Sequence, residues 1–451
     1  MSLLTRRRLL LGACAATVAP PGRAIAMTPR MDVSPAVALQ DVPLRIRLAG
    51  LGPGSRVRVT AETTARDGSV WRSHATFEAD RAGGVDVAAS APVEGTYREA
   101  SAMGLVWSMV REQPAAESGR KRLVDPVEIR FSAETSAGTV ATATVQRLLV
   151  APGVRHRPLD ASGQLRGGWW LPAGRGPHPV IIVLGGSGGG ADHDWAALHA
   201  SHGFAALALA YFRAPGLPRA LVNIPLEYVG SAIDQAIETM RPPRDFVALE
   251  GISRGGELAL LAGATFPKVR AVVGVMASGL VMGPLGEPES GQAGPSAAWT
   301  LARKPVPDLF EGNPRVDWSQ AKTEVSLVPG YLAAMSDAAS VARATIPVER
   351  IRGPVLLISG KDDRLAPRFE LAEIARRRLA QHRHAWRYEH LSYAEAGHTI
   401  APPYVPVTVG SFVHAMTRET MALAGTTEGR AHANEDWWPK ALQFLASAAA
   451  G

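Results

Sequence analysis

The sequence predicts two domains, an antiparallel β-sandwich over residues 27–150 and a mainly parallel, doubly wound α/β domain over residues 151–451. In the first part, short runs of alternating apolar and polar residues recur with turn signals between them. In the second part, continuous apolar runs alternate with helical segments, as expected of strands buried between two layers of helices. The chain of 451 residues is long enough to bury a core in each domain.

A targeting segment is expected over residues 1–26. Adjacent arginines at Arg6–Arg8 precede an apolar run that extends to about Val18, and Ala24–Ala26 has the small-x-small pattern of a cleavage site. Paired arginines are typical of the bacterial twin-arginine signal, which exports folded proteins. We therefore expect an exported protein, either periplasmic or secreted.

Composition excludes several classes of function. The net charge of +7 falls to +3 without residues 1–26, because that segment contains four arginines and no acidic residue. No basic run is interleaved with aromatic residues, so nucleic acid is not an expected partner. Cys14 is the only cysteine, and its loss with the signal excludes disulfides, thiolate metal sites and a cysteine nucleophile. After Ile25, no apolar run approaches the ~20 residues that span a bilayer.

The first domain is expected to be structural or to shape the substrate site, because it holds no cluster of acids, bases or nucleophiles. Asp67 and Gly68 form a hairpin turn signal between two of its strands. The segment Ser101–Met109 is too apolar for a surface loop, so we expect it to pack against another part of the chain. The predicted strands are residues 44–48, 57–60, 71–77, 127–131 and 139–145.

In the second domain, one helix is expected at Leu226–Met240. A Pro/Gly-rich insertion near residues 280–330 interrupts the alternation, and we expect it to lie as a lid over the carboxyl edge of the sheet. His193, His199 and His202 are assigned to a surface helix. The predicted strands are residues 180–184, 204–210, 246–250, 271–276, 354–359 and 386–391.

Ser253 is the candidate nucleophile. It stands in the pattern G-x-S-x-G between Gly251 and Gly255, after an apolar strand and before a helix. Such a strand–turn–helix exposes the serine hydroxyl, and the small residues let neighbouring backbone approach. The alternative is a glycine-rich turn that carries a serine by chance, and the rest of the chain must decide between the two.

A serine needs a histidine to take its proton and a carboxylate to orient that histidine. Asp362 and Asp363 follow a predicted strand, and His398 follows the last one. Asp363 is preferred because it lies one residue deeper in the loop, Asp362 is the alternative acid, and both could instead cap a helix. The order Ser, Asp, His along the chain is that of α/β hydrolases.

Donors for an oxyanion are expected from two backbone segments. One is the N–H of Arg254, directly after the nucleophile, and the other is the N–H of Ser187 or Gly188 in a glycine-rich loop after a strand. The loop lacks the Gly-Lys-Ser/Thr ending of a phosphate-binding loop. No spacing of histidines and carboxylates indicates a metal site, and no cofactor is expected.

These residues and several longer motifs resemble the acyl-CoA thioesterase / bile acid-CoA:amino acid N-acyltransferase family over nearly the whole mature chain. The resemblance implies an immunoglobulin-like domain, an α/β-hydrolase domain, and a triad falling on Ser253, Asp363 and His398. It also implies acyl thioesters of CoA as substrates. The matching motifs are Met103–Trp107, Pro152–Arg155, Gly186–Gly190, Leu226–Tyr228, Gly251–Leu258, Ile346–Arg350, Asp362–Asp363 and Gly397–Tyr404.

The nucleophile favours hydrolysis over transfer to an amine. The amidating members of the resembled family use cysteine at the elbow, and a thioester acyl-enzyme is readily attacked by an amine. Ser253 would form an oxygen ester that suits attack by water. The alternatives are an acyltransferase to an amino acid, a general carboxylesterase or lactone hydrolase, and, more distantly, a non-catalytic binding protein. Export separates the enzyme from cytoplasmic CoA, so the sequence does not identify the leaving group of the substrate. The sequence does not predict the oligomeric state either.

Overall fold

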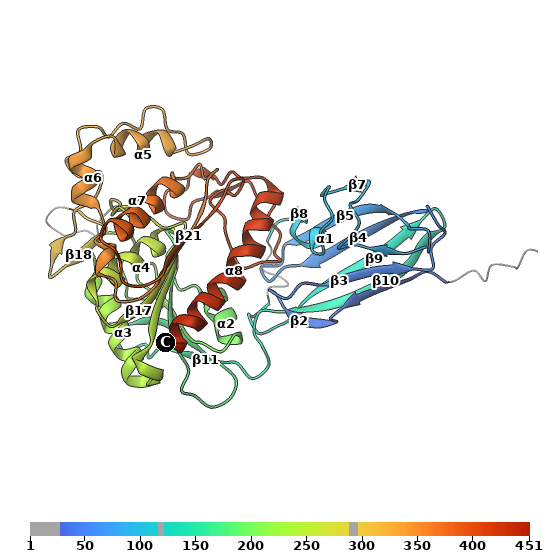
Figure 1. The fold of residues 1–451 in the computed structure, drawn as a ribbon, viewed down its shortest axis with the longest axis horizontal. Coiled ribbons are helices and arrows are strands. Elements are labelled where there is room, and N and C mark those ends of the chain that lie inside the picture. Colours follow the sequence, from blue (N-terminus) through green and yellow to red (C-terminus); the bar gives the residue numbers. More distant parts are fainter. Residues whose placement is uncertain (1–27, 116–120, 288–295) are drawn as a thin grey trace, which may run out of the picture.

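The computed structural model describes residues 28–115, 121–287 and 296–451. The expected targeting segment therefore lies outside the described residues. Figure 1 shows a β-sandwich beside a larger domain in which helices flank a central sheet. The chain has the predicted fold, an α/β-hydrolase fold preceded by an immunoglobulin-like β-sandwich.

The first domain consists of two sheets whose strands alternate buried and exposed residues. In the hairpin of β4 and β5, Thr64 pairs with Val70 across the turn that Asp67 and Gly68 form, and Gly68 takes a positive φ of 84°. The smaller sheet contains β1 (Arg30–Ser34), β3 (Arg45–Ala49) and β6 (Val85–Asp86). The larger contains β2 (Val37–Leu39), β10 (Gly138–Leu148), β9 (Val127–Thr135), β4 (Arg56–Thr64), β5 (Val70–Glu78), β7 (Glu94–Gly95) and β8 (Val110–Gln113).

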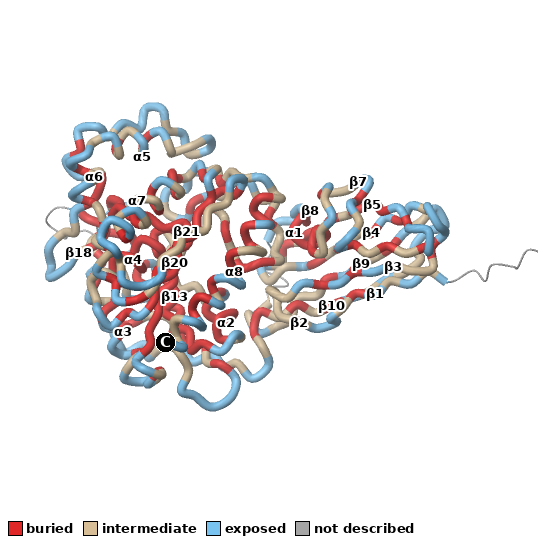
Figure 2. Tube along the Cα trace, viewed as in Figure 1, coloured by how far each residue is buried: buried red, intermediate tan, exposed pale blue. Residues whose placement is uncertain are grey.

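The second domain is built on an eight-stranded sheet in which β13 lies between β14 and β16 in parallel register. The first two strands, β11 and β12, are antiparallel and form one edge. The central strands are buried along their whole length, which explains their continuous apolar runs (Figure 2). In order across the sheet, the strands are β11 (Arg155–Pro158), β12 (Arg166–Leu171), β14 (Ala205–Ala210), β13 (Val180–Leu184), β16 (Val247–Ile252), β17 (Val269–Val275), β20 (Val355–Gly360) and β21 (Tyr388–Tyr393).

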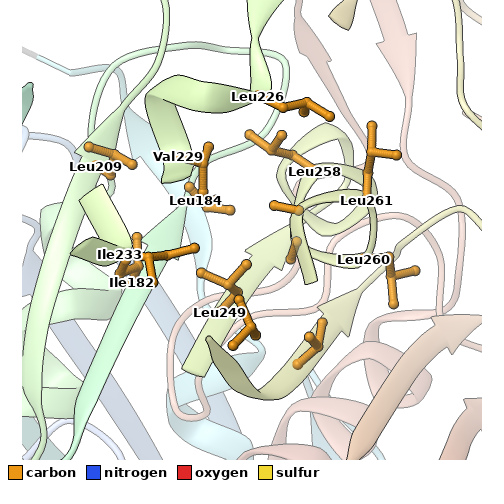
Figure 3. Packing of buried hydrophobic residues seen from close by; sticks show 14 of the residues in the cluster. Ile182, Leu184, Leu209, Leu226, Val229, Ile233, Leu249, Leu258, Leu260 and Leu261 are labelled. Atoms are coloured by element: carbon orange, nitrogen blue, oxygen red, sulfur yellow. The ribbon is translucent and has the colours of Figure 1, made fainter. Parts of the chain in front are cut away.

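Helices cover both faces of this sheet. On one face, α3 (Leu226–Met240), α4 (Arg254–Thr265) and α7 (Arg368–Gln381) share a core with the strands. Figure 3 shows Leu258 of α4 and Val229 of α3 packed with Ile182 and Leu249 of the sheet. On the other face, α2 (His193–Ser201) and α8 (Thr427–Ala450) form a second core. Helix α4, which follows Ser253 directly, is thus fixed by packing along its length.

Between β17 and β20, the chain leaves the sheet and forms an insertion. It contains β18 (Trp299–Leu301), β19 (Lys304–Pro305), α5 (Val328–Met335), α6 (Ala338–Ala344) and the short helix η2 (Val348–Arg350). The ribbon places α5 and α6 at one end of the α/β domain (Figure 1). The segment predicted near residues 280–330 belongs to this insertion, except for residues 288–295, which are outside the described residues.

The two domains share part of a core. The apolar segment Ser101–Met109 includes the short helix α1 (Gly104–Trp107), which is buried in the first domain together with Val407 of the second. The Val407 N–H donates to the Trp107 carbonyl at 3.0 Å, and the Thr408 hydroxyl donates to the Met109 carbonyl at 2.7 Å. Trp438 of α8 adds a hydrogen bond to Asp41 at 2.7 Å. The prediction that Ser101–Met109 packs against another part of the chain is confirmed.

The prediction of a surface helix around His193, His199 and His202 is wrong for the helix itself, because the residues of α2 from Trp195 to Ala200 are buried. His202, directly after the helix, is exposed, and His193 is half-buried. His199 has no exposed surface, and its Nε2 lies 2.8 Å from a carboxylate oxygen of Glu250 on β16. A histidine can be buried at this position because Glu250, which is itself buried, is its hydrogen-bond partner.

In the part of the chain that the structure describes, no helix combines the length and the apolar character needed to cross a membrane.

Candidate active site

The candidate catalytic side chains follow neighbouring strands at the carboxyl edge of the sheet. Ser253 follows β16, Asp363 follows β20, and His398 lies in the loop after β21. These strands run in parallel, and β17 is the only strand between β16 and β20. Parallel strands deliver the residues that follow them to one edge, so the three predicted positions lie on the same side of the domain. All three residues are buried.

The turn at Ser253 has the geometry of a nucleophile elbow. Ser253 takes φ 56° and ψ −115°, a region that costs a residue with a side chain about 1–3 kcal/mol and that neighbouring structure must hold. A Cβ on Gly251 would collide with the Gly255 carbonyl, and one on Gly255 would collide with the carbonyls of Leu184 and Gly185. The glycines of the motif are therefore required by close backbone approach, and they bring the elbow against the loop after β13.

Asp363, rather than Asp362, faces the histidine. Its Oδ2 lies 2.6 Å from His398 Nδ1, and its Oδ1 accepts backbone hydrogen bonds from Leu365 at 2.8 Å and Ala366 at 3.2 Å. Asp362 accepts from the Gly425 N–H at 3.0 Å and keeps 43% of its side chain exposed. The buried carboxylate of Asp363 thus holds the ring with Nδ1 protonated and Nε2 available as a base.

The Ser253 hydroxyl lies beside an arginine that the sequence did not single out. Nη2 of Arg368 lies 3.5 Å from Ser253 Oγ, and within the described residues no hydrogen bond joins Ser253 to His398. Arg368 is 3% exposed, and its Nε and Nη1 have no hydrogen-bond partner among the described residues. The residue starts α7, only five positions after Asp363, but no pattern in that loop points to a contact with Ser253.

Ser253 opens into a pocket of about 420 Å³. The insertion supplies much of its wall, and this wall is largely apolar and aromatic. Polar groups on the pocket come from the elbow, the glycine-rich loop, the start of α7, the segment around His414 and Thr323 of the insertion. The lining residues include Leu285, Phe310, Trp318, Leu327, Tyr331, Leu365, Met421, Ser187, Arg254, Arg368 and His414.

The first turn of α4 ties the insertion to the elbow. The buried guanidinium of Arg254 donates to the carbonyls of Gly283 at 2.9 Å and Met282 at 3.1 Å. Glu257, which has no exposed surface, accepts from Trp299 Nε1 at 2.7 Å and from the Met282 N–H at 3.1 Å. Burial raises the pKa of Glu257, and Arg254 partly opposes that shift. The wall of the pocket is therefore fixed to the turn that presents Ser253.

The expected oxyanion donors lie close to the elbow, but they do not all face the same space. The Arg254 N–H is the first of α4 and has no acceptor within its own helix. Ser187 lines the pocket with Ser253, whereas Gly188 lines an adjoining hollow with Asp192 and His193.

Side chains from two other segments hold this loop. Tyr211 donates to the Gly185 carbonyl at 2.6 Å, and Arg213 donates to the Gly188 carbonyl at 2.9 Å. His414 Nε2 lies 3.0 Å from Ser187 Oγ. Sequence reasoning missed all three residues. Tyr211 and Arg213 follow β14 at the same sheet edge and could have been found there, but His414 sits in a short hairpin with no motif around it.

Across the described residues, no group of three or more histidine, cysteine or carboxylate side chains is placed to hold a metal ion.

Comparison with known proteins matches both domains to one family. Residues 41–161 match the family described as the acyl-CoA thioester hydrolase/BAAT N-terminal region. Residues 224–451 match the one described as the BAAT/acyl-CoA thioester hydrolase C terminal. The chain belongs to the acyl-CoA thioester hydrolase/BAAT family. The resemblance seen in the sequence motifs is thereby confirmed.

Relatives within this family align over almost their whole length. Human acyl-coenzyme A thioesterase 6 is 31% identical over 415 residues, which cover 90% of this chain and 93% of the relative. Mouse peroxisomal succinyl-coenzyme A thioesterase is 29% identical over 90% of this chain and 93% of the relative. Mouse acyl-coenzyme A amino acid N-acyltransferase 1 is 28% identical over 92% and 97%. The family thus includes proteins named for hydrolysis and proteins named for transfer.

Proposed function

We propose that this protein is a serine hydrolase that cleaves acyl thioesters through Ser253, His398 and Asp363. The observation that carries the proposal is the buried Asp363–His398 pair, 2.6 Å apart, at the sheet edge where the strained turn presents Ser253. A buried carboxylate on Nδ1 of a histidine sets the tautomer that a general base requires. The family to which the chain belongs makes an acyl thioester the natural substrate class.

In this mechanism, His398 Nε2 takes the proton of the Ser253 hydroxyl while Oγ bonds to the scissile carbonyl carbon. The carbonyl oxygen becomes an oxyanion, which the N–H groups of Arg254 and Ser187 stabilise. As the tetrahedral intermediate collapses, the carbon–sulfur bond breaks and His398 returns the proton to the leaving thiolate. Water, deprotonated by the same histidine, then hydrolyses the acyl-enzyme and restores Ser253.

Arg368 leaves the Ser253 proton available to His398. Its Nη2 points toward Ser253 Oγ as a donor, so the oxygen accepts and the hydroxyl proton can be directed to His398 Nε2. Catalytic hydrogen bonds often tighten only in the complex with substrate. The aromatic and aliphatic wall around Phe310, Trp318 and Leu327 would receive the acyl chain.

Water is the proposed acceptor because Ser253 forms an oxygen ester, which amines attack less readily than the thioester a cysteine would form. The named activity of mouse acyl-coenzyme A amino acid N-acyltransferase 1 belongs to that protein, and its likeness to this chain makes transfer the second candidate.

Export through the twin-arginine route is also part of the proposal, motivated by Arg6–Arg8 and Ala24–Ala26. An exported enzyme would meet a thioester carrier other than CoA, or an ester or lactone.

A substrate panel tests the proposal. Butyryl-, decanoyl- and palmitoyl-CoA are compared with the matching acyl-pantetheine thioesters, p-nitrophenyl esters and lactones, with and without added glycine or taurine. We expect thioesters to be hydrolysed to free acid without amide product. Preference for esters or lactones would refute the thioester assignment, and amide formation would favour the transferase. A fluorophosphonate, which reacts with activated serines, should label one serine stoichiometrically. Absence of labelling would favour a non-catalytic binding protein.

A further inference from the structure

A second hydroxyl faces the pocket beside the nucleophile, and its proton has no assigned role. Ser187 lies in the glycine-rich loop after β13 and lines the same pocket as Ser253. The loop and the elbow are in contact, because a Cβ on Gly186 would lie 3.5 Å from Ser253 Cβ. Gly186 is thus a direct neighbour of the nucleophile, and Ser187 is the next residue in the chain.

The hydrogen bonds of His414 determine which way the Ser187 proton points. His414 Nδ1 accepts the backbone N–H groups of Met416 and Thr417, both at 3.3 Å, so this nitrogen carries no proton. The proton of the neutral ring must then be on Nε2, which lies 3.0 Å from Ser187 Oγ. Nε2–H donates, the Ser187 oxygen accepts, and the hydroxyl proton of Ser187 is left to donate elsewhere.

The neutral ring that this requires is favoured by its surroundings. His414 is buried, and burial together with the nearby charge of Arg213 lowers its pKa, while Glu419 acts in the opposite direction. Within the described residues, the Ser187 hydroxyl takes part in no hydrogen bond other than the one it accepts from His414, so its own proton has no protein acceptor there. The space in front of this hydroxyl is the pocket, where the scissile carbonyl must sit to meet Ser253.

We propose that the Ser187 hydroxyl is a catalytic donor to the oxyanion, oriented by His414 as a positioning residue. The inference rests on the proposed function and adds a side-chain donor to the backbone N–H groups of Arg254 and Ser187. When Ser253 Oγ bonds to the carbonyl carbon, the carbonyl electron pair moves to oxygen and the Ser253 proton moves to His398. The Ser187 O–H then donates a hydrogen bond to that oxygen and keeps its proton throughout.

Transition-state and ground-state ligands separate this role from a structural one. In Ser187→Ala, we expect kcat for a p-nitrophenyl ester to fall about 10²–10³-fold, the usual effect of losing one oxyanion donor. The inhibition constant of an alkyl trifluoromethyl ketone, which forms a serine-bound oxyanion, should rise by a similar factor. That of an alkyl methyl thioether, which cannot form an oxyanion, should stay unchanged. Ser187→Thr should restore most of the activity.

The role of His414 is tested by non-additivity. His414→Leu should lower kcat, whereas His414→Gln should keep more of kcat because its amide can still donate to Ser187. The double variant Ser187→Ala/His414→Leu should be no slower than Ser187→Ala alone. Ser162→Ala, which removes an exposed hydroxyl bonded to Asp160 at 2.8 Å, is the control for the substitution itself.

Titration of Ser253 with the fluorophosphonate counts the folded active sites, and each kcat is calculated per labelled site. The same titration separates a failure of this inference from a failure of the proposed function. If the probe does not label Ser253, the proposed function is wrong. If labelling persists but Ser187→Ala keeps kcat within twofold, or weakens the ketone and the thioether equally, the hydroxyl is not an oxyanion donor. An additive loss in the double variant would assign His414 a structural role.

Discussion

At the residue scale, the site depends on which atoms each polar group can reach. Asp362 and Asp363 are adjacent in sequence, yet their surroundings differ. Asp363 is buried against His398, whereas Asp362 is half-exposed and accepts a hydrogen bond from the Gly425 N–H. Only a carboxylate on Nδ1 keeps Nε2 free for the serine proton. The two aspartates should therefore differ sharply in their effect on catalysis.

Asp363→Asn should lower kcat about 10⁴-fold, because an amide can hold the wrong tautomer of His398. Asp362→Asn is the matched control and should stay within a few-fold of the wild type. Steady-state hydrolysis of one thioester by both variants checks this. Equal losses, or a larger loss in Asp362→Asn, would transfer the role of triad acid to Asp362.

Ser253→Cys should shift the product toward amide when glycine or taurine is present. The acyl-enzyme would then be a thioester, which amines attack more readily than they attack an oxygen ester. Mass spectrometry of the acid and amide products gives their ratio, with wild type and Ser253→Ala as references. An unchanged ratio would mean that the pocket, and not the nucleophile, selects water.

At the element scale, α7 links the catalytic loop to the edge of the sheet. It begins at Arg368 beside Ser253, and one turn later Glu373 faces β21. Glu373 accepts from Arg376 at 2.7 Å and from His390 at 2.7 Å, and these contacts, led by that of Arg376, lower its pKa to about 2. Burial lowers the pKa of His390, so the neutral ring donates to the carboxylate.

This carboxylate makes stability depend on pH with a defined sign. The pKa of Glu373 falls from 4.5 to about 2 on folding, so its contribution is present above 4.5 and is lost as pH falls toward 2. Glu373→Gln should be less stable than wild type at neutral pH, and the difference should shrink as pH falls from 4.5 toward about 2. Urea unfolding across that range measures it, with the exposed Glu370→Gln as control. A difference independent of pH would contradict the assignment.

At the scale of the whole molecule, the segment after His398 connects the active site to the sandwich. Tyr404 and Val405 pack against the first-domain core, and Val407 is buried within it. The first domain therefore supports the loop that carries the base, although it holds none of the candidate catalytic residues.

Trp107→Ala should destabilise the protein by about 3–5 kcal/mol, because Trp107 is buried at this junction and its loss leaves a cavity. It should also lower kcat by loosening the backbone contact with Val407. Thermal unfolding and activity below the transition measure both effects, and Trp386→Ala, at a 43% exposed tryptophan, is the control. Full activity in a destabilised Trp107→Ala would show that the sandwich does not support the site.

The fold could be predicted from the sequence because periodicity and glycine placement are local signals. The helix Leu226–Met240 matches its predicted bounds. The strand expected at residues 386–391 instead runs from Tyr388 to Tyr393, and Trp386 lies exposed in the bend before it. Ser253, Asp363 and His398 could be proposed because each follows a strand. Arg368 and His414 could not, since their roles depend on contacts across 115 and 227 residues of chain.

The most direct test of the central claim is the rate at which Ser253→Ala releases thiol from decanoyl-CoA, relative to wild type. The assay has little protein background because Cys14 is the only cysteine. The mechanism predicts a fall of about 10³-fold or more, in a variant that unfolds like the wild type. A Ser253→Ala enzyme with undiminished thiol release would contradict the assignment of Ser253 as the nucleophile.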